Sequence, residues 1–334
     1  MTYKITIIIP VYGVEPYIED CLRSVMKQDY SGPLECILVD DCSPDKSIDI
    51  AKQILNEYHG SINFRIVTHE RNMGLSGARN TGIKESTGEY VYLLDSDDEI
   101  TSDCISSLAE PLANKRYDMV VGEYSVQGAE DIYQHLYDTD REIVGHESII
   151  SSKRMGIWYP MAVNKLYNKD FLIKNNLEFC EGIIHEDELF SAEIACVMKS
   201  MYVKSSASTY IYKIRNGSIT TFPNIKRRLD SYIKILTEYR RFIDYRQLEK
   251  QAETNDMIQV LFYQACFIAY RYNSSTYFQN YVKFRGIVSK YYSDRFWHNN
   301  RLRSFIRDIH YMLPPILGMY VYRILFLRNA RNNS

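Results

Sequence analysis

The strongest constraint on the fold is a regular alternation of apolar runs and helical patterns over the first hundred residues. The first run, at residues 5–9, is β-branched and ends at Pro10, which is typical of a buried strand. Strands separated by helices of this length form βαβ units, so the sequence predicts a doubly wound, mostly parallel sheet. The expected strands are 5–9, 34–39, 64–68 and 89–94, and the expected helices are 14–25, 47–58 and 76–86.

After residue 100 the pattern changes in two steps. A helix is expected near 102–113 and a strand at 119–126, whereas 127–157 has no clear periodicity. Residues 202–214 alternate as in a pair of strands, and the chain has only helical periodicity from about 225 onward. The expected C-terminal helices are 229–243, 256–272 and 277–291. The turn-forming residues Phe222-Pro223-Asn224 therefore predict a boundary between a 1–222 domain, with halves 1–100 and 101–222, and a helical 223–334 region.

Charge is distributed unevenly although the formal net charge is only −2. Residues 1–230 hold 24 Lys/Arg and 35 Asp/Glu, which fits a metal site and argues against nucleic acid as a partner. Residues 231–334 hold 16 Lys/Arg and 7 Asp/Glu. That basic balance fits an anionic membrane surface, and solvated helix faces explain it equally well.

The cysteines and the chain's start indicate a cytoplasmic protein. None of the seven cysteines forms a CxxC pair, and most lie in apolar runs, as free thiols do in a reducing compartment. The first residues enter a strand without a signal-peptide pattern. The most apolar tail segment, 312–327, contains Pro314, Pro315 and Arg323 and is too short to span a bilayer.

Polar residues follow the ends of several expected strands. These segments are Pro10-Val11-Tyr12, Asp40-Asp41, the loop before Asn72, and Asp95–Asp98. In a parallel sheet ligands bind beyond the carboxyl ends of the strands. The four segments are therefore predicted to line one crevice.

The acidic run Asp95-Ser96-Asp97-Asp98 is the leading candidate for chemistry. Alternate residues of an extended segment point to one side, so Asp95 and Asp97 are expected to converge. Two carboxylates this close repel unless a cation or a proton intervenes. Mn²⁺ or Mg²⁺ binds one or two carboxylates and completes its shell with phosphate oxygens and water, so the run predicts a metal–diphosphate site. The alternative is a helix N-cap.

Two further side chains, Asp41 and Arg79, have both a binding and a structural interpretation, and Tyr12 has a binding interpretation. Asp41 could accept a hydrogen bond from a uracil N–H or a ribose hydroxyl, or it could form a turn. Tyr12 could stack on a base. Arg79 offers a planar donor fork to phosphate, or it could pair with an aspartate at a strand end.

A second acidic run, His185-Glu186-Asp187-Glu188, could supply a general base. A sugar hydroxyl is a poor nucleophile unless a base removes its proton during attack, and Asp187 or Glu186 could do so. The alternative is an acid-rich helix start, which the helix dipole favours. Lys213 and Arg215, near Ser218, could neutralise a departing diphosphate or belong to a solvated loop.

Together these motifs resemble bacterial family 2 glycosyltransferases with the GT-A fold. The resemblance rests on 7–12, 39–45, 72–80 and 94–98, and the second acidic run extends it to about residue 220. It implies an inverting displacement on a nucleoside diphosphate sugar, usually a UDP-sugar, with 1–100 binding the nucleotide and 101–222 binding the acceptor and holding the base.

The resemblance also implies roles for individual residues. Donor-binding roles fall on Pro10, Val11, Tyr12, Asp40, Asp41, Asn72, Arg79, Asp95, Ser96, Arg215 and Ser218, of which the last two resemble a loop that closes over the diphosphate. Asp97, with Asp95, resembles the ligand set of a Mn²⁺ or Mg²⁺ ion, and Asp187, with Glu186 beside it, resembles the base.

The predicted function is sugar transfer to a saccharide or lipid-linked saccharide hydroxyl in surface polysaccharide synthesis, by a hexosyl- or N-acetylhexosaminyltransferase. A sugar nucleotidyltransferase would need a glycine-rich phosphate loop after the first strand, which is absent, and a non-catalytic nucleotide-sugar-binding protein would leave the acidic runs without a purpose. Residues 283–331 hold ten Lys/Arg among aromatic residues. They predict peripheral contact with the inner face of the cell membrane, or packing on the catalytic domain or on a second subunit in a homo-oligomer.

Overall fold

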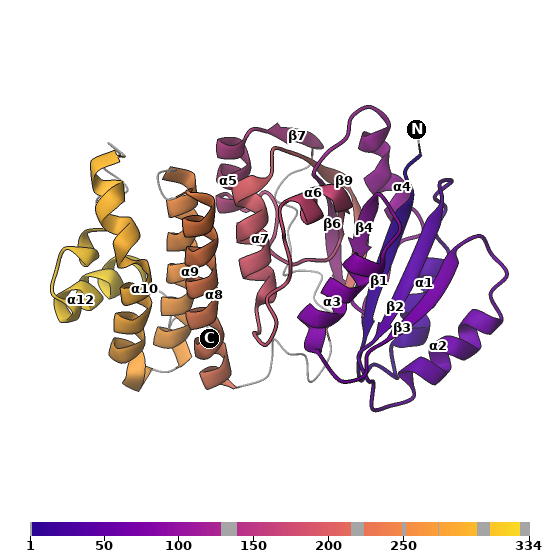
Figure 1. Ribbon diagram of the computed structural model, residues 1–334, viewed down its shortest axis with the longest axis horizontal. Coiled ribbons are helices and arrows are strands. Elements are labelled where there is room, and N and C mark those ends of the chain that lie inside the picture. The colour runs from indigo at the N-terminus through magenta and orange to yellow at the C-terminus, as the bar shows by residue number, and fades with distance from the viewer. Residues whose placement is uncertain are drawn as a thin grey trace. The chain divides into compact units, whose positions relative to one another are not determined.

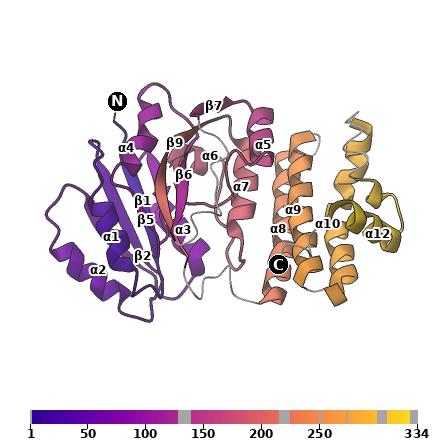
Figure 2. The same ribbon diagram turned by 180° about the vertical axis from the view of Figure 1, so that it is seen from behind.

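The computed structural model divides the chain into two compact units, each described here by itself. The first unit comprises Met1–Gly182 and Val197–Thr221, and the second comprises Ile183–Cys196 and Phe222–Ser334. The structure describes residues 2–127, 139–214, 224–248, 252–272, 274–298 and 308–327. Figures 1 and 2 show a twisted sheet with flanking helices in the first unit and helices in the second.

The predicted parallel sheet forms the centre of the first unit. Its first four strands lie in the order β3-β2-β1-β4, and each neighbouring pair is parallel. Both β1 and β2 are buried along their whole length, because helices cover both faces of the sheet. The strands are β1 (Ile5–Val11), β2 (Leu34–Asp40), β3 (Asn63–Thr68) and β4 (Tyr90–Leu93).

The connecting helices α1 (Ile18–Met26), α2 (Ser47–Asn56) and α3 (Gly74–Glu85) follow the predicted pattern. Helix α3 lies very close to the sheet at Gly82. A Cβ atom at Gly82 would be 2.2 Å from Cγ2 of Ile8 on β1, so only glycine fits at this approach. Gly82 thus serves the packing of α3 on β1.

The other half of the sheet is mixed. Strand β8 (Lys165–Asn168) pairs antiparallel with β4 and β6 (Met119–Gln127), and β9 (Ser200–Lys213) pairs parallel with β6. The prediction of a strand pair at 202–214 is wrong, because β9 is one strand of 14 residues. On the edge of β9 that does not pair with β6, its first residues pair with β7 (Arg141–Val144) and its last residues pair with β5 (Glu99–Ile100). The two ends of β9 therefore have different neighbours, which gives them different sequence patterns.

Three shorter helices complete the described part of the first unit. The expected helix at 102–113 is split into α4 (Cys104–Ala109) and a 3-10 turn, η1 (Glu110–Ala113). Helix α5 (His146–Arg154) lies in the 127–157 segment that has no clear periodicity, and α6 (Lys169–Lys174) follows β8.

The second unit is helical. Its C-terminal helices confirm the periodicity, and α7 groups with them although it lies before residue 222. The helices are α7 (Glu186–Val197), α8 (Ile225–Arg246), α9 (Ala252–Tyr272), α10 (Tyr277–His298) and α12 (Pro315–Phe326), with 3-10 turns η2 (Ser274–Thr276) and η3 (Ile309–Tyr311). None of the helices within the described residues is long and apolar enough to cross a membrane.

Candidate active site

The loop after β1 is fastened to the loop after β2 by side-chain hydrogen bonds. Ser43 Oγ accepts from Gly13 N at 2.9 Å, and Asp45 Oδ2 accepts from Glu15 N at 2.9 Å. Burial acts to raise the pKa of Asp45, but hydrogen bonds from Ser47, Glu15 and Ser43 outweigh it and lower that pKa to about 2. The acidic motif after β2 therefore fixes the backbone that carries Tyr12.

Asp41 fixes the start of α3. Its carboxylate accepts from Met73 N at 2.7 Å and from Gly74 N at 2.8 Å, and His69 Nδ1 lies 2.7 Å from its Oδ1. These N–H groups belong to the unsatisfied donors of a helix N-terminus, which a carboxylate stabilises. The buried Asp41 therefore has a structural role that the sequence pattern left open.

The other predicted contacts at these strand ends differ in exposure. Pro10 and Val11 end β1 with buried side chains, and Val11 belongs to the hydrophobic core. Tyr12, by contrast, is 51% exposed. Asp40 is buried and accepts from Ser43 N, whereas Asn72 is exposed and accepts from Gly74 N. Of these five, only Tyr12 and Asn72 present their side chains to solvent.

Arg79 connects α3 to the end of β4. Its Nη2 donates to Asp95 Oδ1 at 2.9 Å, and its guanidinium lies 5.2 Å from the ring centroid of Phe179. Asn80 holds the same segment, because its side chain both donates to Phe179 O and accepts from Phe179 N. The predicted pairing of Arg79 with a strand-end aspartate is confirmed, and the buried arginine aims Asp95.

Burial alternates along Asp95–Asp98. Ser96 and Asp98 are buried, whereas Asp95 and Asp97 are partly exposed. Asp98 accepts from Tyr210 Oη at 2.5 Å and from Lys213 N at 2.9 Å, which ties this turn to the end of β9. Burial first, and then the charges of Asp95 and Asp97, raise the pKa of Asp98 to about 8. Asp98 is thus a structural residue.

Asp95 and Asp97 are the residues that fit a divalent cation. Two half-exposed carboxylates provide hard oxygen ligands, and the charges that raise the pKa of Asp98 show how acidic this turn is. Among the described residues, no group of three or more His, Cys, Asp or Glu side chains is placed to hold a metal.

Lys213, considered as a partner for diphosphate, is engaged by carboxylates instead. Its Nζ contacts Glu99 and lies 3.4 Å from Asp20 Oδ2. Arg215 and Ser218 lie outside the described residues.

The second unit carries the predicted base at the start of α7. Both Glu186, which is buried, and Asp187, which is partly exposed, lie in its first turn. Ser231 Oγ on α8 accepts from Ile184 N at 3.0 Å, and Gln264 Nε2 on α9 donates to Glu188 Oε1 at 2.9 Å. Two other helices therefore position the turn that contains Asp187.

His185 precedes that turn with a φ of +65°, an uncommon value for a non-glycine residue. Its ring packs 5.6 Å from the ring of Tyr232. Burial and the nearby Arg228 lower the pKa of His185, and Asp187 opposes them. Sequence reasoning missed Ser231, Tyr232 and Gln264, because single residues in amphipathic helices carry no distinguishing pattern.

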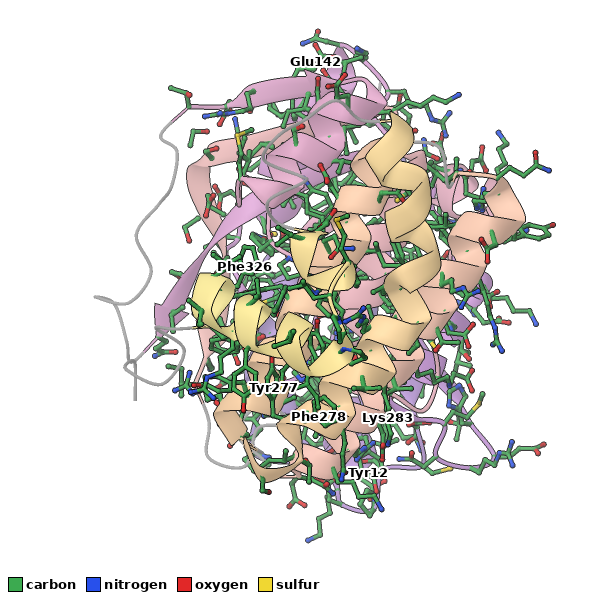
Figure 3. The ribbon with its side chains drawn as sticks, turned by 90° about the vertical axis from the view of Figure 1, so that its left-hand side faces the viewer. Tyr12, Glu142, Tyr277, Phe278, Lys283 and Phe326 are labelled. Carbon is green, nitrogen blue, oxygen red and sulfur yellow. The ribbon has the colours of Figure 1, made fainter. Side chains whose placement is uncertain are left out.

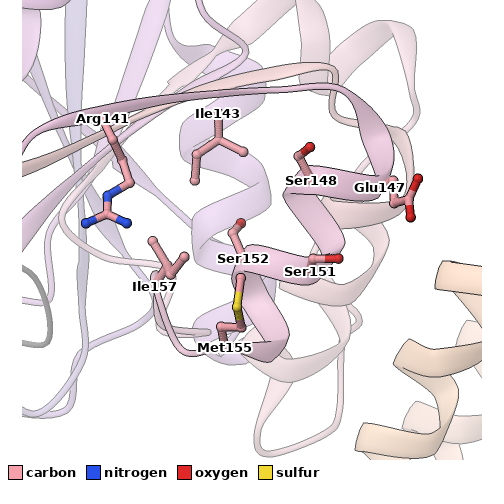
Figure 4. A pocket seen from close by; sticks show the side chains of 8 residues that line it. All are labelled: Arg141, Ile143, Glu147, Ser148, Ser151, Ser152, Met155 and Ile157. Atoms are coloured by element: carbon pink, nitrogen blue, oxygen red, sulfur yellow. The ribbon is translucent and has the colours of Figure 1, made fainter. Parts of the chain in front are cut away.

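An open pocket of about 420 Å³ lies between β7 and α5, and none of its lining residues is a predicted site residue (Figure 4). Its lining mixes hydroxyl, charged and apolar side chains. The lining residues are Arg141, Ile143, Glu147, Ser148, Ser151, Ser152, Met155 and Ile157.

Known proteins with similar sequences are glycosyltransferases. Glycosyltransferase GlyA of Streptococcus pneumoniae is 31% identical over 65% of this chain and 31% of its own length. The uncharacterized glycosyltransferase EpsJ of Bacillus subtilis is 33% identical over 69% of this chain and 66% of its own length. The chain thus covers less than two thirds of either relative.

A solved structure with the same fold is that of Staphylococcus aureus TarS, residues 1–349, in complex with UDP-GlcNAc. The two share 19% identity and a TM-score of 0.71 over 98% of this chain and 92% of that chain. The model for glycosyl transferase family 2 matches residues 6–175. These findings confirm the predicted GT-A fold and the assignment as a glycosyltransferase, and this chain belongs to glycosyl transferase family 2.

Proposed function

We propose that this glycosyltransferase transfers a hexose or N-acetylhexosamine from a UDP-sugar to a hydroxyl of a saccharide or lipid-linked saccharide in surface polysaccharide synthesis. The observation that carries the proposal is the edge beyond β1 and β4, where buried Arg79 aims Asp95 beside partly exposed Asp97. TarS was solved with UDP-GlcNAc, which makes that sugar nucleotide the first donor to test.

Residues at the strand ends would bind the nucleotide. The exposed ring of Tyr12 offers a surface on which a base can stack. Asp41 already receives three protein contacts, and a carboxylate has about four acceptor positions, so one acceptor position is left for a donor hydroxyl or N–H. Asp40, Asn72 and Ser96 would complete this set, and Arg215 and Ser218 remain predictions from sequence.

Asp97 and Asp95 would hold the metal ion. A bound Mn²⁺ or Mg²⁺ supplies positive charge that stabilises the departing diphosphate. Arg79 holds Asp95 in place through a charge-assisted hydrogen bond, which keeps one carboxylate oriented when the donor is absent.

Asp187 would act as the general base, and Glu186 is the alternative. As the acceptor oxygen forms its bond to the anomeric carbon, Asp187 takes the hydroxyl proton, and UDP leaves with the electrons of the broken C–O bond. Attack opposite the leaving group inverts the anomeric configuration. Asp187 lies in the first turn of α7.

A donor screen tests the proposal. The purified full chain is incubated with several UDP-sugars and GDP-sugars, with saccharide acceptors, and with Mn²⁺, Mg²⁺ or EDTA, and nucleotide release is measured. We expect UDP release that depends on the sugar and the acceptor and is abolished by EDTA. Release from GDP-sugars alone, or turnover that EDTA leaves unchanged, would contradict the UDP and metal assignments respectively.

A further inference from the structure

The last described helix, α12, exposes a continuous apolar face. Large apolar side chains recur at spacings of one, three and four residues, which places them on one side of a helix. They are Ile316 (56% exposed), Leu317 (54%), Tyr320 (50%) and Ile324 (65%). Exposed apolar side chains are ordinary when scattered singly, whereas these four gather on one face of a single helix.

The opposite side of α12 is packed firmly onto the second unit. Gly318, Met319 and Tyr322 are buried, and a Cβ atom at Gly318 would lie 2.3 Å from the carbonyl oxygen of His310. Arg285 on α10 donates to the carbonyl oxygens of His310, Tyr311 and Leu313, which fixes the turn before α12. Figure 3 shows α12 lying across α10, with Phe326 marking its C-terminal end. The apolar face is therefore presented by a fixed helix.

Charge identifies the kind of partner. The one charged residue of α12 is Arg323, and the chain from residue 299 to 334 contains six arginines and one acidic residue, Asp308. Basic residues therefore flank the apolar helix on both sides in the sequence. Each basic residue near an anionic lipid surface strengthens binding, so this composition complements a negatively charged bilayer.

The size of α12 argues against a membrane-spanning helix and against a protein interface, and in favour of binding at a bilayer surface. Helix α12 has 12 residues and is therefore about 18 Å long, far short of the roughly 30 Å of a hydrocarbon core. A helix about 10 Å wide offers only some 200 Å² of face, whereas a stable protein interface needs about 800 Å² from each partner. A helix with one apolar face can nevertheless bind a lipid surface, because its side chains insert below the headgroups.

We propose that α12 docks this chain on an anionic lipid bilayer. The helix lies in the plane of the membrane surface and inserts Ile316, Leu317, Tyr320 and Ile324. Arg323 stays at the level of the lipid phosphates. The inference is independent of the sugar donor and of the catalytic assignments.

Flotation of the full-length protein tests this surface. One set of vesicles contains phosphatidylglycerol and phosphatidylcholine, and the other contains phosphatidylcholine alone. We expect binding to the anionic vesicles, and a partition coefficient roughly a hundredfold lower for the double variant Ile316→Ser/Ile324→Ser, because two buried isoleucines are lost. Arg323→Gln should weaken binding about fivefold and reduce its salt dependence.

A matched control substitutes two equally exposed residues of the first unit. Val144 and Ile173 are 54% and 56% exposed, so Val144→Ser/Ile173→Ser removes similar apolar surface elsewhere and should leave flotation unchanged. Unchanged melting temperature and donor hydrolysis in the α12 variant would show that it is folded. Equal flotation of the two double variants overturns the proposal, as does a wild-type chain that does not float. A dimer by light scattering that Ile316→Ser/Ile324→Ser dissociates, without flotation, would assign the face to a second copy.

Discussion

The two acidic regions that we assign to catalysis are built in different ways. In the first unit, the strand-end acids are held by backbone donors of neighbouring loops, as Asp41 is by Met73 and Gly74. In the second unit, the turn that carries Asp187 is held by Ser231 and Gln264, which lie 47 and 76 positions beyond their partners in the chain. The first arrangement leaves a recognisable sequence motif, whereas the second depends on how helices pack.

The largest effect is expected at the base. Asp187→Asn should lower the turnover number about a thousandfold, because general-base catalysis contributes factors of about 10²–10⁴. UDP affinity, measured by calorimetry, should stay near that of the wild type, because the substitution leaves the strand-end residues that we assign to the nucleotide unchanged. Loss of UDP binding instead would make Asp187 a donor or structural residue.

Glu186→Gln is the matched comparison, because Glu186 is the adjacent acid in the same turn but is buried. It should reduce turnover much less than Asp187→Asn does. The reverse order of the two variants would exchange their roles.

Asp41→Asn tests the strand-end region of the first unit. It leaves Met73 N and Gly74 N with a weaker acceptor and should lower the free energy of unfolding by about 2 kcal/mol, measured by urea denaturation. Asp49→Asn, an exposed aspartate on α2, is the control and should change it by less than about 0.5 kcal/mol. If both variants are equally stable, Asp41 does not fix the start of α3.

Ser231→Ala tests the region built at long range. Removing the acceptor of Ile184 N should cost about 1 kcal/mol of stability and lower the turnover number several-fold, with the KM for the donor unchanged. Ser231→Thr keeps the hydroxyl and should restore turnover. A rise in donor KM without loss of turnover would show that the turn serves donor binding.

The last prediction concerns the pH dependence of stability and Glu193 on α7. Burial, opposed by Arg246 and supported by Glu238, raises the pKa of Glu193 from 4.5 to about 8. A raised carboxyl pKa means that the folded state binds the proton more tightly. The stability that protonated Glu193 contributes to the folded state is fully present below pH 4.5 and is lost as the pH rises through about 8.

Glu193→Gln removes this titration, so its melting temperature should decline by a few degrees less than that of the wild type between pH 4.5 and 8. Parallel profiles for the two proteins would show that Glu193 ionises normally.

These two regions also show what the sequence can and cannot reveal. Strands β1 and β2 are continuous apolar runs, so burial on both faces made them predictable. The prediction of a metal site at Asp95 and Asp97 came from their place after a strand, and in the structure both are partly exposed there. The two-residue strand β5 is too short for a periodic signal, and the change of neighbours along β9 made one strand resemble two. Ser231 became visible only through the packing of α8.

The absence of a side chain at Gly82 also affects the ion pair between Arg79 and Asp95, although Gly82 touches neither of the two charged groups. Arg79 lies one helical turn earlier on α3, so the closeness of that helix to β1 decides how far its guanidinium reaches toward Asp95. Adding one methyl group at position 82 would displace the helix and separate this pair. Random mutagenesis should therefore find position 82 as intolerant as an active-site residue, although glycine contributes no chemical group of its own.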